Sequence, residues 1–226
     1  MIATKPGMAK SSTRIALRGV FLIALLSLAG CSILPEREPI SVYEPVLAEP
    51  VAHPEWPQAN WSLLVARPVA SQQLDSERIT VRPSPGSLQV YKGAAWSDNA
   101  PDLMQSALLR RFQDAENILS VSRSGGGVRG QFQLLSDLRS FESVYAQPGQ
   151  PQAVIELYVR LVRTSDGQVV AARGFREVEA AADDNLGSVV DAFSRSINRL
   201  TDQVVGWALV SGNQFASKSA AAKSGN

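Results

Sequence analysis

The chain holds one cysteine, Cys31, and one histidine, His53, and these two side chains limit the chemistry it can perform. One cysteine excludes an intramolecular disulfide, and one cysteine with one histidine cannot supply the ligands of a Cys/His metal site. His53 lies in a proline-rich stretch, where it is a poor base for a Ser–His triad, and the serines lack the G-x-S-x-G context of a nucleophile elbow. We therefore expect no metal site, no catalytic residue and no enzyme activity.

Cys31 ends an N-terminal segment that has three parts. Four basic and no acidic residues come first, then the apolar run of residues 20–28, and then Leu28-Ala29-Gly30-Cys31. The apolar run is shorter than the roughly 20 residues that span a bilayer, and it is typical of a signal-peptide core. Either Met1 or Met8 can start this segment, so residues 1–30 are interpreted as a signal peptide.

The residues around Cys31 resemble the lipobox of bacterial lipoproteins. The resemblance implies cleavage between Gly30 and Cys31, a diacylglycerol on the Cys31 thiol, and an acyl chain such as palmitate on the freed amine. Each buried CH₂ contributes roughly 0.8 kcal/mol, so several chains anchor a protein firmly. Ser32 stands where an Asp would favour the inner membrane, so we expect the periplasmic face of the outer membrane. The alternative is an ordinary signal peptide with an incidental cysteine.

The charge of the mature chain argues against nucleic acid as a partner. The formal charge is +1, but four of the 22 basic residues precede Cys31. The remaining 18 basic residues face 21 acidic residues, which leaves about −3. A mildly acidic protein lacks the positive surface that attracts a phosphate backbone.

Residues 31–60 and 212–226 differ in composition from the body between them. The first segment carries six prolines after Cys31, which block helices and favour extended chain. We interpret it as a lipidated tether that could reach about 85 Å at about 3.1 Å per residue. Its apolar pairs Val42-Tyr43 and Val46-Leu47 either dock on the body or are incidental. The second segment is small and polar, and it is predicted to be a disordered tail.

Residues 61–211 form the body, and the periodicity changes along it. An amphipathic helix is predicted from Pro101, with Leu103, Leu108 and Phe112 on one face. The triple glycine at 125–127 lacks the flanking pattern of a phosphate-binding loop. Short apolar or alternating runs predict strands at 61–68, 79–82, 88–91 and 119–122.

Three longer extended segments follow. In 132–145 the apolar residues change parity between Leu138 and Phe141, which a bulge or bend would reconcile. Residues 154–162 alternate strictly, Asp166-Gly167 supplies a tight turn, and residues 169–178 return. This pattern predicts a β-hairpin.

The body closes with its most regular helix. Apolar residues recur at steps of three and four from Leu186 to Trp207, and Asn185 or Asp184 is the expected N-cap. The stripe is interpreted as core packing on the sheet, with a partner or lipid groove as the alternative. The element order predicts a mixed β-sheet with two main amphipathic helices in a single α/β or α+β domain.

Several sequence features follow the lipobox in a defined order. They are Leu63-Leu64-Val65, Leu74-Asp75, Arg78-Ile79, Arg82, Leu88, Tyr91, Trp96, the helix with Leu103, Leu108 and Phe112, Phe141-Glu142, the Asp166-Gly167 hairpin and the final helix. This order resembles the ABC-type transport auxiliary lipoprotein family, which includes the lipoprotein component of the paraquat-inducible system.

The resemblance implies a transport accessory protein with no cofactor beyond the lipids on Cys31. Members resemble partners of ABC systems that carry an MCE-type (mammalian cell entry) substrate-binding protein and move phospholipids or other apolar molecules. It implies docking to the MCE-domain protein, contact with a lipid cargo, and a three-layer fold similar to anticodon-binding domains. Self-association into a homo-oligomer stays open. The alternative is a structural or assembly lipoprotein of another envelope machine.

Four residues of the body are candidates for partner binding. Asp75, Arg78 and Arg82 surround a short predicted strand and form either a docking surface or a surface ion-pair cluster. Trp96 lies in a predicted loop and serves either as an interface anchor or as a cap on the core. Trp61 and Trp207 are interpreted as core residues.

Overall fold

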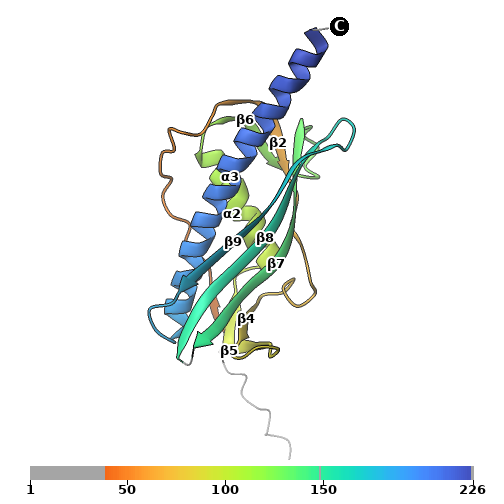
Figure 1. Cartoon of the computed structure of the whole chain (residues 1–226). Helices are drawn as coiled ribbons and strands as arrows, with labels where there is room; N and C mark the ends of the chain where they lie inside the picture. The colour runs from red at the N-terminus through yellow and green to blue at the C-terminus, as the bar shows by residue number, and fades with distance from the viewer. Residues whose placement is uncertain (1–38, 148, 225–226) are drawn as a thin grey trace, which may run out of the picture. The chain divides into compact units, whose positions relative to one another are not determined.

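One mixed β-sheet and two helices organise the computed structural model, which describes residues 39–147 and 149–224 (Figure 1). Cys31, Gly30 and the first part of the expected tether lie outside the described residues. The elements run in the order β1 (Ser41–Tyr43), β2 (Ala59–Val65), β3 (Val69–Ala70), β4 (Arg78–Arg82), β5 (Gln89–Trp96), α2 (Ala100–Asp114), β6 (Ile118–Arg123), β7 (Phe132–Gln147), β8 (Gln150–Arg163), β9 (Val169–Ala180) and α3 (Leu186–Ser224).

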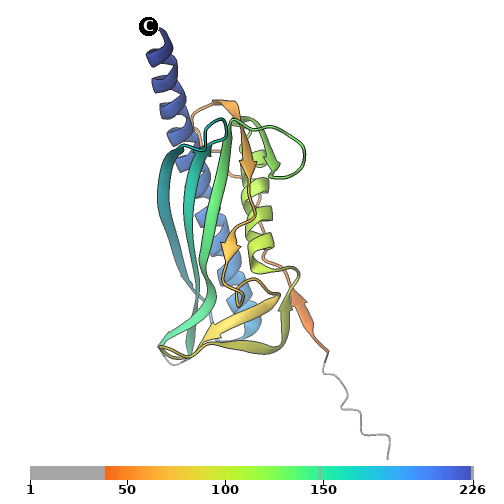
Figure 2. The same ribbon diagram turned by 90° about the vertical axis from the view of Figure 1, so that its right-hand side faces the viewer.

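The sheet is built on β7. On one side β7 pairs antiparallel with β8 along its length, and β8 pairs antiparallel with β9. On its other side β7 meets three short parallel strands in succession, first β2, then β3, then β4. β6 lies beside β2, while β5 and then β1 lie beyond β4. The sheet therefore has two ends, seen in Figure 2, which we call the β2 end and the β4 end.

The parity change in β7 comes from an irregularity in its pairing with β8. The register shifts between Leu138 and Ser140, so one residue changes the face toward which the side chains point. Leu134 and Leu138 are buried before the shift, and Phe141 is buried after it. The prediction of a bulge or bend is confirmed, and this irregularity keeps the apolar side chains of both halves of the strand on the core face.

The hairpin of β8 and β9 is confirmed, with its turn at Asp166-Gly167. Gly167 has a φ of 72°, a left-handed conformation that glycine adopts without the steric cost of a Cβ. Ile155, Leu157, Val159 and Leu161 of β8 are buried, as the alternation predicts. The hairpin thus forms an amphipathic half of the sheet that needs a cover on one face.

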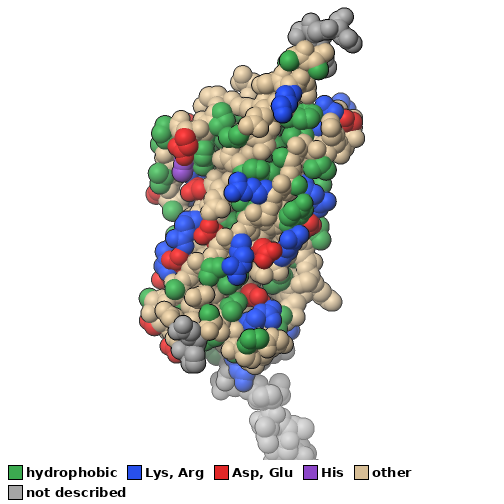
Figure 3. All heavy atoms as spheres, in the orientation of Figure 1, with side chains coloured by type: hydrophobic (Ala, Val, Ile, Leu, Met, Phe, Trp, Pro, Cys, Tyr) green, Lys and Arg blue, Asp and Glu red, His purple; other side chains and the backbone are tan. Residues whose placement is uncertain are grey.

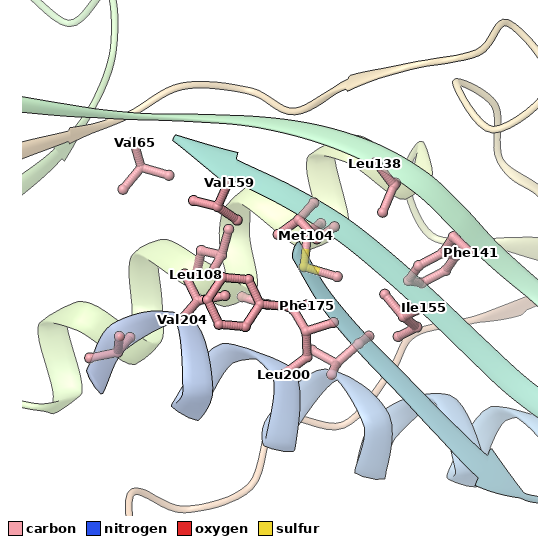
Figure 4. Close-up of a cluster of buried hydrophobic side chains, with 14 of the residues drawn as sticks. Val65, Met104, Leu108, Leu138, Phe141, Ile155, Val159, Phe175, Leu200 and Val204 are labelled. Atoms are coloured by element: carbon pink, nitrogen blue, oxygen red, sulfur yellow. The ribbon is translucent and has the colours of Figure 1, made fainter. Parts of the chain in front are cut away.

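Helices α2 and α3 supply that cover and enclose the core with the sheet (Figure 4). Met104 and Leu108 of α2 and Leu200 and Val204 of α3 belong to one cluster with Val159 of β8, and all five are buried. Pro101 stands in the first turn of α2, where its missing N–H needs no helical partner. The predicted N-cap of α3 is confirmed, because the Ser188 amide donates to Asn185 Oδ1 at 2.9 Å.

The prediction of a disordered tail from residue 212 is wrong. α3 continues without a break to Ser224. Gly212 lets the Trp61 ring approach the helix more closely than any Cβ would allow, and Trp61 Nε1 donates to Asn213 Oδ1 at 2.7 Å. The rest of the segment is rich in Ala and Lys, good helix formers that carry little hydrophobic signal.

The tether predicted for residues 31–60 is too long, because residues 41–57 dock on the body; one residue of each apolar pair docks, whereas Val42 and Val46 are exposed. Ser41 to Tyr43 form β1 beside β5, and Tyr43 and Leu47 pack against the core. Residues 44–57, which we call the strap, then follow the helices toward the β2 end. They meet α3 at Ser194, Asn198, Asp202 and Gly206, one residue per helical turn.

Ion pairs cover the face where α3 lies on β9. Arg195 pairs with Glu179 at 2.6 Å and Arg199 pairs with Glu177 at 3.2 Å, and Figure 3 shows basic and acidic side chains beside one another on this face. Such exposed pairs add little stability each. The prediction of a single α/β domain is confirmed, whereas the likeness to anticodon-binding domains is not.

Candidate functional site

The predicted docking residue Asp75 is held by a cation that sequence reasoning missed. Arg67 Nη2 lies 2.5 Å from Asp75 Oδ1, and Arg67 Nε donates to Asp102 Oδ1 at 2.7 Å. Asn99 Nδ2 also donates to Asp75 Oδ1, at 3.2 Å. The hydrogen bond from Arg67 is the main reason that the pKa of Asp75 lies below its usual value. This cluster joins the chain after β2 to the first turn of α2.

The other two charged candidates lie apart from that cluster. Arg82 pairs with Glu142 of β7, Nη2 to Oε2 at 2.9 Å, and Glu142 is only 9% exposed. Arg78 is exposed and lines a surface depression of about 710 Å³ together with Asp75. The structure thus brings Asp75 and Arg78 to one depression, and it gives Arg82 a role in joining β4 to β7.

Trp96 belongs to the core and ends β5, so its assignment to a loop is wrong. Its ring is 1% exposed and packs edge-on against Phe141 and Phe193, with centroid distances of 5.5 and 5.1 Å. The indole is therefore not available on the surface as an anchor. Of the two readings given for Trp96, the cap on the core is the one that the structure supports.

A groove of about 660 Å³ lies at the β2 end, and it is the strongest candidate site. Its walls come from four segments: the start of β2, the start of β7, the turn after β8, and α3 beyond Gly212. In Figure 1 this part of α3 extends beyond the β8–β9 turn. The groove exists only because the last part of the chain is helical, since a disordered tail would leave this side of the groove without a wall.

Aromatic side chains form the base of this groove. Trp61 packs edge-on against Phe132 at 5.0 Å, and Phe132 packs edge-on against Phe215 at 6.2 Å. Trp61 and Phe132 are buried, whereas Phe215 is half-buried. Phe215 follows Val204 by eleven residues, or three helical turns, so a continued apolar stripe was the signal that could have revealed it.

Arg163 gives the groove its charge. Its guanidinium lies 4.8 Å from the centre of the Phe215 ring, a cation–π contact. Asp166 Oδ1 accepts from Nε at 2.9 Å and Gln168 Oε1 accepts from Nη2 at 2.8 Å, which fixes the guanidinium over the ring. The hydrogen bond from Arg163 holds the pKa of Asp166 below its usual value. The lining itself contains no acidic residue.

A second polar cluster fixes the strap at its far end. The His53 ring stacks on Trp56 at 4.0 Å, and His53 Nδ1 lies 2.8 Å from Glu55 Oε1. Arg111 of α2 lies 5.1 Å from the Trp56 ring and pairs with Asp202 of α3. These contacts tie the strap to both helices, so His53 takes part in packing the strap on the body.

The described residues meet the requirements of neither a metal centre nor a membrane-spanning helix. Within residues 39–147 and 149–224, no group of three His, Cys, Asp or Glu side chains could hold a metal ion. No helix in the same part of the chain is long and apolar enough to cross a membrane. What the groove offers is an aromatic base, a fixed cation and a polar rim, which suit binding.

A family model described as the ABC-type transport auxiliary lipoprotein component matches residues 46–205. The match begins in the strap and ends in α3, so it covers nearly all of the folded body. The family description names a transport component and no catalytic activity.

Two solved structures are similar to this chain in fold, and one further relative is similar in sequence. A crystal structure of a Xanthomonas campestris protein is 39% identical, with a TM-score of 0.75, and the match covers 78% of this chain and 99% of that one. A crystal structure of an uncharacterized protein has a TM-score of 0.59 at 15% identity, over 74% of this chain and 97% of that one, and shows the fold alone. An uncharacterized protein of Bradyrhizobium diazoefficiens is 27% identical over 66% of this chain, which spans 40% of that relative's length.

Proposed function

Because the chain belongs to the family of ABC-type transport auxiliary lipoprotein components, we propose that it is an accessory subunit of an ABC system that carries an MCE-domain protein. In this proposal the body binds the MCE-domain protein through protein–protein contacts, and the system moves lipids or other apolar molecules. The observation that carries the proposal is the family match over residues 46–205, which includes both helices' packing on the sheet.

The proposed anchor is Cys31, with a diacylglycerol on its thiol and an acyl chain on its amine. Signal cleavage between Gly30 and Cys31 would leave the body on the periplasmic face of the outer membrane. Since Ser41 is already held in β1, about ten residues separate it from Cys31, and at about 3.4 Å each they reach at most about 34 Å. The body would therefore stay near the membrane, in place of the 85 Å stand-off expected from a free tether.

The binding surface supports an adaptor role. The groove at the β2 end is open, aromatic at its base and polar at its rim, which is the composition of surfaces that bind other proteins. These properties favour a protein that positions partners.

The experiment that tests the proposal uses purified protein that begins at Ser32, and the periplasmic part of an MCE-domain protein from the same genome. We expect a complex without acylation, measured by size exclusion with light scattering and by interferometry. Absence of any complex over the micromolar range would contradict the proposal. A stable complex with an outer-membrane assembly machine instead would favour the alternative role as an assembly lipoprotein.

The anchor is tested separately in cells. Cys31→Ser should move the protein from the outer-membrane fraction to the soluble periplasmic fraction, while Ser32→Asp should move it to the inner membrane. An unchanged distribution of Cys31→Ser would contradict lipid anchoring.

A further inference from the structure

We propose that the groove at the β2 end binds an extended acidic segment of the MCE-domain partner and places an apolar side chain of that segment on Phe215. The inference rests on the proposed function and assigns the contact to one site. It commits to a peptide segment as the occupant of the groove.

The base of the groove is built to receive an apolar side chain. Phe132 and Trp61 are buried beneath it and hold each other edge-on. Phe215 completes this row and is only half-buried. A half-exposed aromatic on a rigid base is the usual form of an interface anchor, because its ordering cost is already met.

The charge around the groove selects an acidic partner. Arg163 lines the groove, and exposed Arg129 and Lys218 each adjoin lining residues in sequence. The acidic residue closest in sequence to the lining is Asp166, which directly follows Ser165. Its carboxylate already forms an ion pair with Arg163. Beyond Asp202 the sequence to Asn226 contains no Asp or Glu. The site therefore has a positive balance, which attracts an acidic segment and raises its association rate.

The rim favours a peptide over an acyl chain. Gln58 and Asn60 line the groove with amide groups, and Ser217 and Ser219 add hydroxyl groups from α3. Amides both donate and accept hydrogen bonds, as an extended peptide backbone does. An acyl chain in the same place would cover these groups without bonding them, which costs free energy.

The position of the groove agrees with a partner that arrives from the periplasm. The described chain enters through β1, which belongs to the β4 end, and the groove lies at the β2 end (Figure 2). Phe132 lines the groove and Glu142 pairs with β4. Glu142 follows Phe132 by ten positions in β7, which span about 33 Å at about 3.3 Å each. The site is therefore at the end of the sheet opposite β1, where the described chain begins.

The test measures the affinity of the purified protein that begins at Ser32 for the periplasmic part of the MCE-domain protein, with two pairs of matched variants. Phe215→Ala removes the anchor, and Val69→Ala is its control because Val69 is 67% exposed on β3. Lys218→Glu reverses a charge on α3 between the lining residues Ser217 and Ser219, and Lys92→Glu makes the same change on β5 at the β4 end. Circular dichroism checks that each variant is folded.

We expect Phe215→Ala to weaken binding at least about tenfold, as truncation of an anchor does. Lys218→Glu should weaken it severalfold at low salt and less at high salt, while both controls stay within about twofold of the wild type. If the wild type binds and both groove variants bind with the same affinity, the assignment of the contact to the groove is overturned, but the proposed function stands. No binding by the wild type would overturn both. Loss of bound phospholipid from Phe215→Ala in native mass spectrometry, with MCE binding intact, would replace the peptide by a lipid and overturn the inference.

Discussion

Asn198→Ala should release the strap from α3, and the size of the effect can be estimated from its contacts. Asn198 accepts from the Ala48 amide at 3.0 Å and donates to the Val46 carbonyl at 3.1 Å. An intramolecular hydrogen bond contributes about 0.5–1.5 kcal/mol net. Because both bonds are exposed to solvent, we expect a loss of about 1–2 kcal/mol in the local stability of the strap.

Amide hydrogen exchange measures this loss directly. The Val46 amide donates to Ser194 Oγ at 3.0 Å, a bond that the substitution leaves intact, so its exchange reports release of the whole strap. A loss of 1–2 kcal/mol speeds that exchange roughly 5- to 30-fold. Gln214→Ala, on an exposed part of α3 beyond the strap, should leave it unchanged. Exchange of Val46 and Ala48 at random-coil rates in the wild type would refute docking of the strap, and an unchanged Val46 rate in Asn198→Ala would refute the estimate.

Three further predictions follow from the core and from the shifted pKa values. Phe141→Ala, at a position 1% exposed among aromatic rings, should cost about 3–5 kcal/mol and lower the Tm by roughly 6–20 °C in thermal unfolding. The pKa of Asp75 is lowered chiefly by the hydrogen bond from Arg67. Its contribution to stability is therefore present above the unfolded pKa of about 3.9 and is lost as the pH falls through the lower folded pKa. In Arg67→Ala the free energy of unfolding, measured with urea, should depend less on pH in that acid range. A pH dependence as steep as that of the wild type would contradict the pairing. Burial raises the pKa of Tyr91 to about 12, so its phenolate absorbance should appear near pH 12, and a midpoint near 10 would show that the ring is exposed.

The hairpin, the bulge and the N-cap could be predicted because their causes are local. Strict alternation in β8, the parity change around Leu138 and the polar residues before Leu186 each act over a few neighbouring positions. Local patterns of this kind fix which face of an element is buried. They do not fix which distant element covers that face.

The strap and the end of α3 could not be predicted because their causes are distant in sequence. Prolines rule out a helix in the strap, but an extended chain can still dock, and the partner is a polar stripe on α3 at Ser194, Asn198, Asp202 and Gly206. Polar residues at four-residue spacing read as a solvated face when the sequence is considered alone. The continuation of α3 depends on its contact with Trp61, which lies about 150 residues earlier.

The candidate site was missed for the same reason. Asp75 pairs with Arg67 across a turn and with the start of α2, so its partner depends on the path of the chain after β2. Trp96 has neighbours typical of a loop, yet β5 carries it into the core beside Phe193. The groove is formed by four segments that are distant in sequence. One of them is the end of α3, where no large apolar residue follows Phe215 at helical spacing to indicate a helix.

In-cell crosslinking of the tagged full-length protein, followed by mass spectrometry of its partners, tests the central claim most directly. The account predicts an MCE-domain protein and its ABC subunits among the crosslinked partners, with crosslinks from residues near the groove at the β2 end. Recovery of a different envelope machine, with no MCE-domain protein and no ABC subunit, would contradict the assignment of this chain to a transport complex.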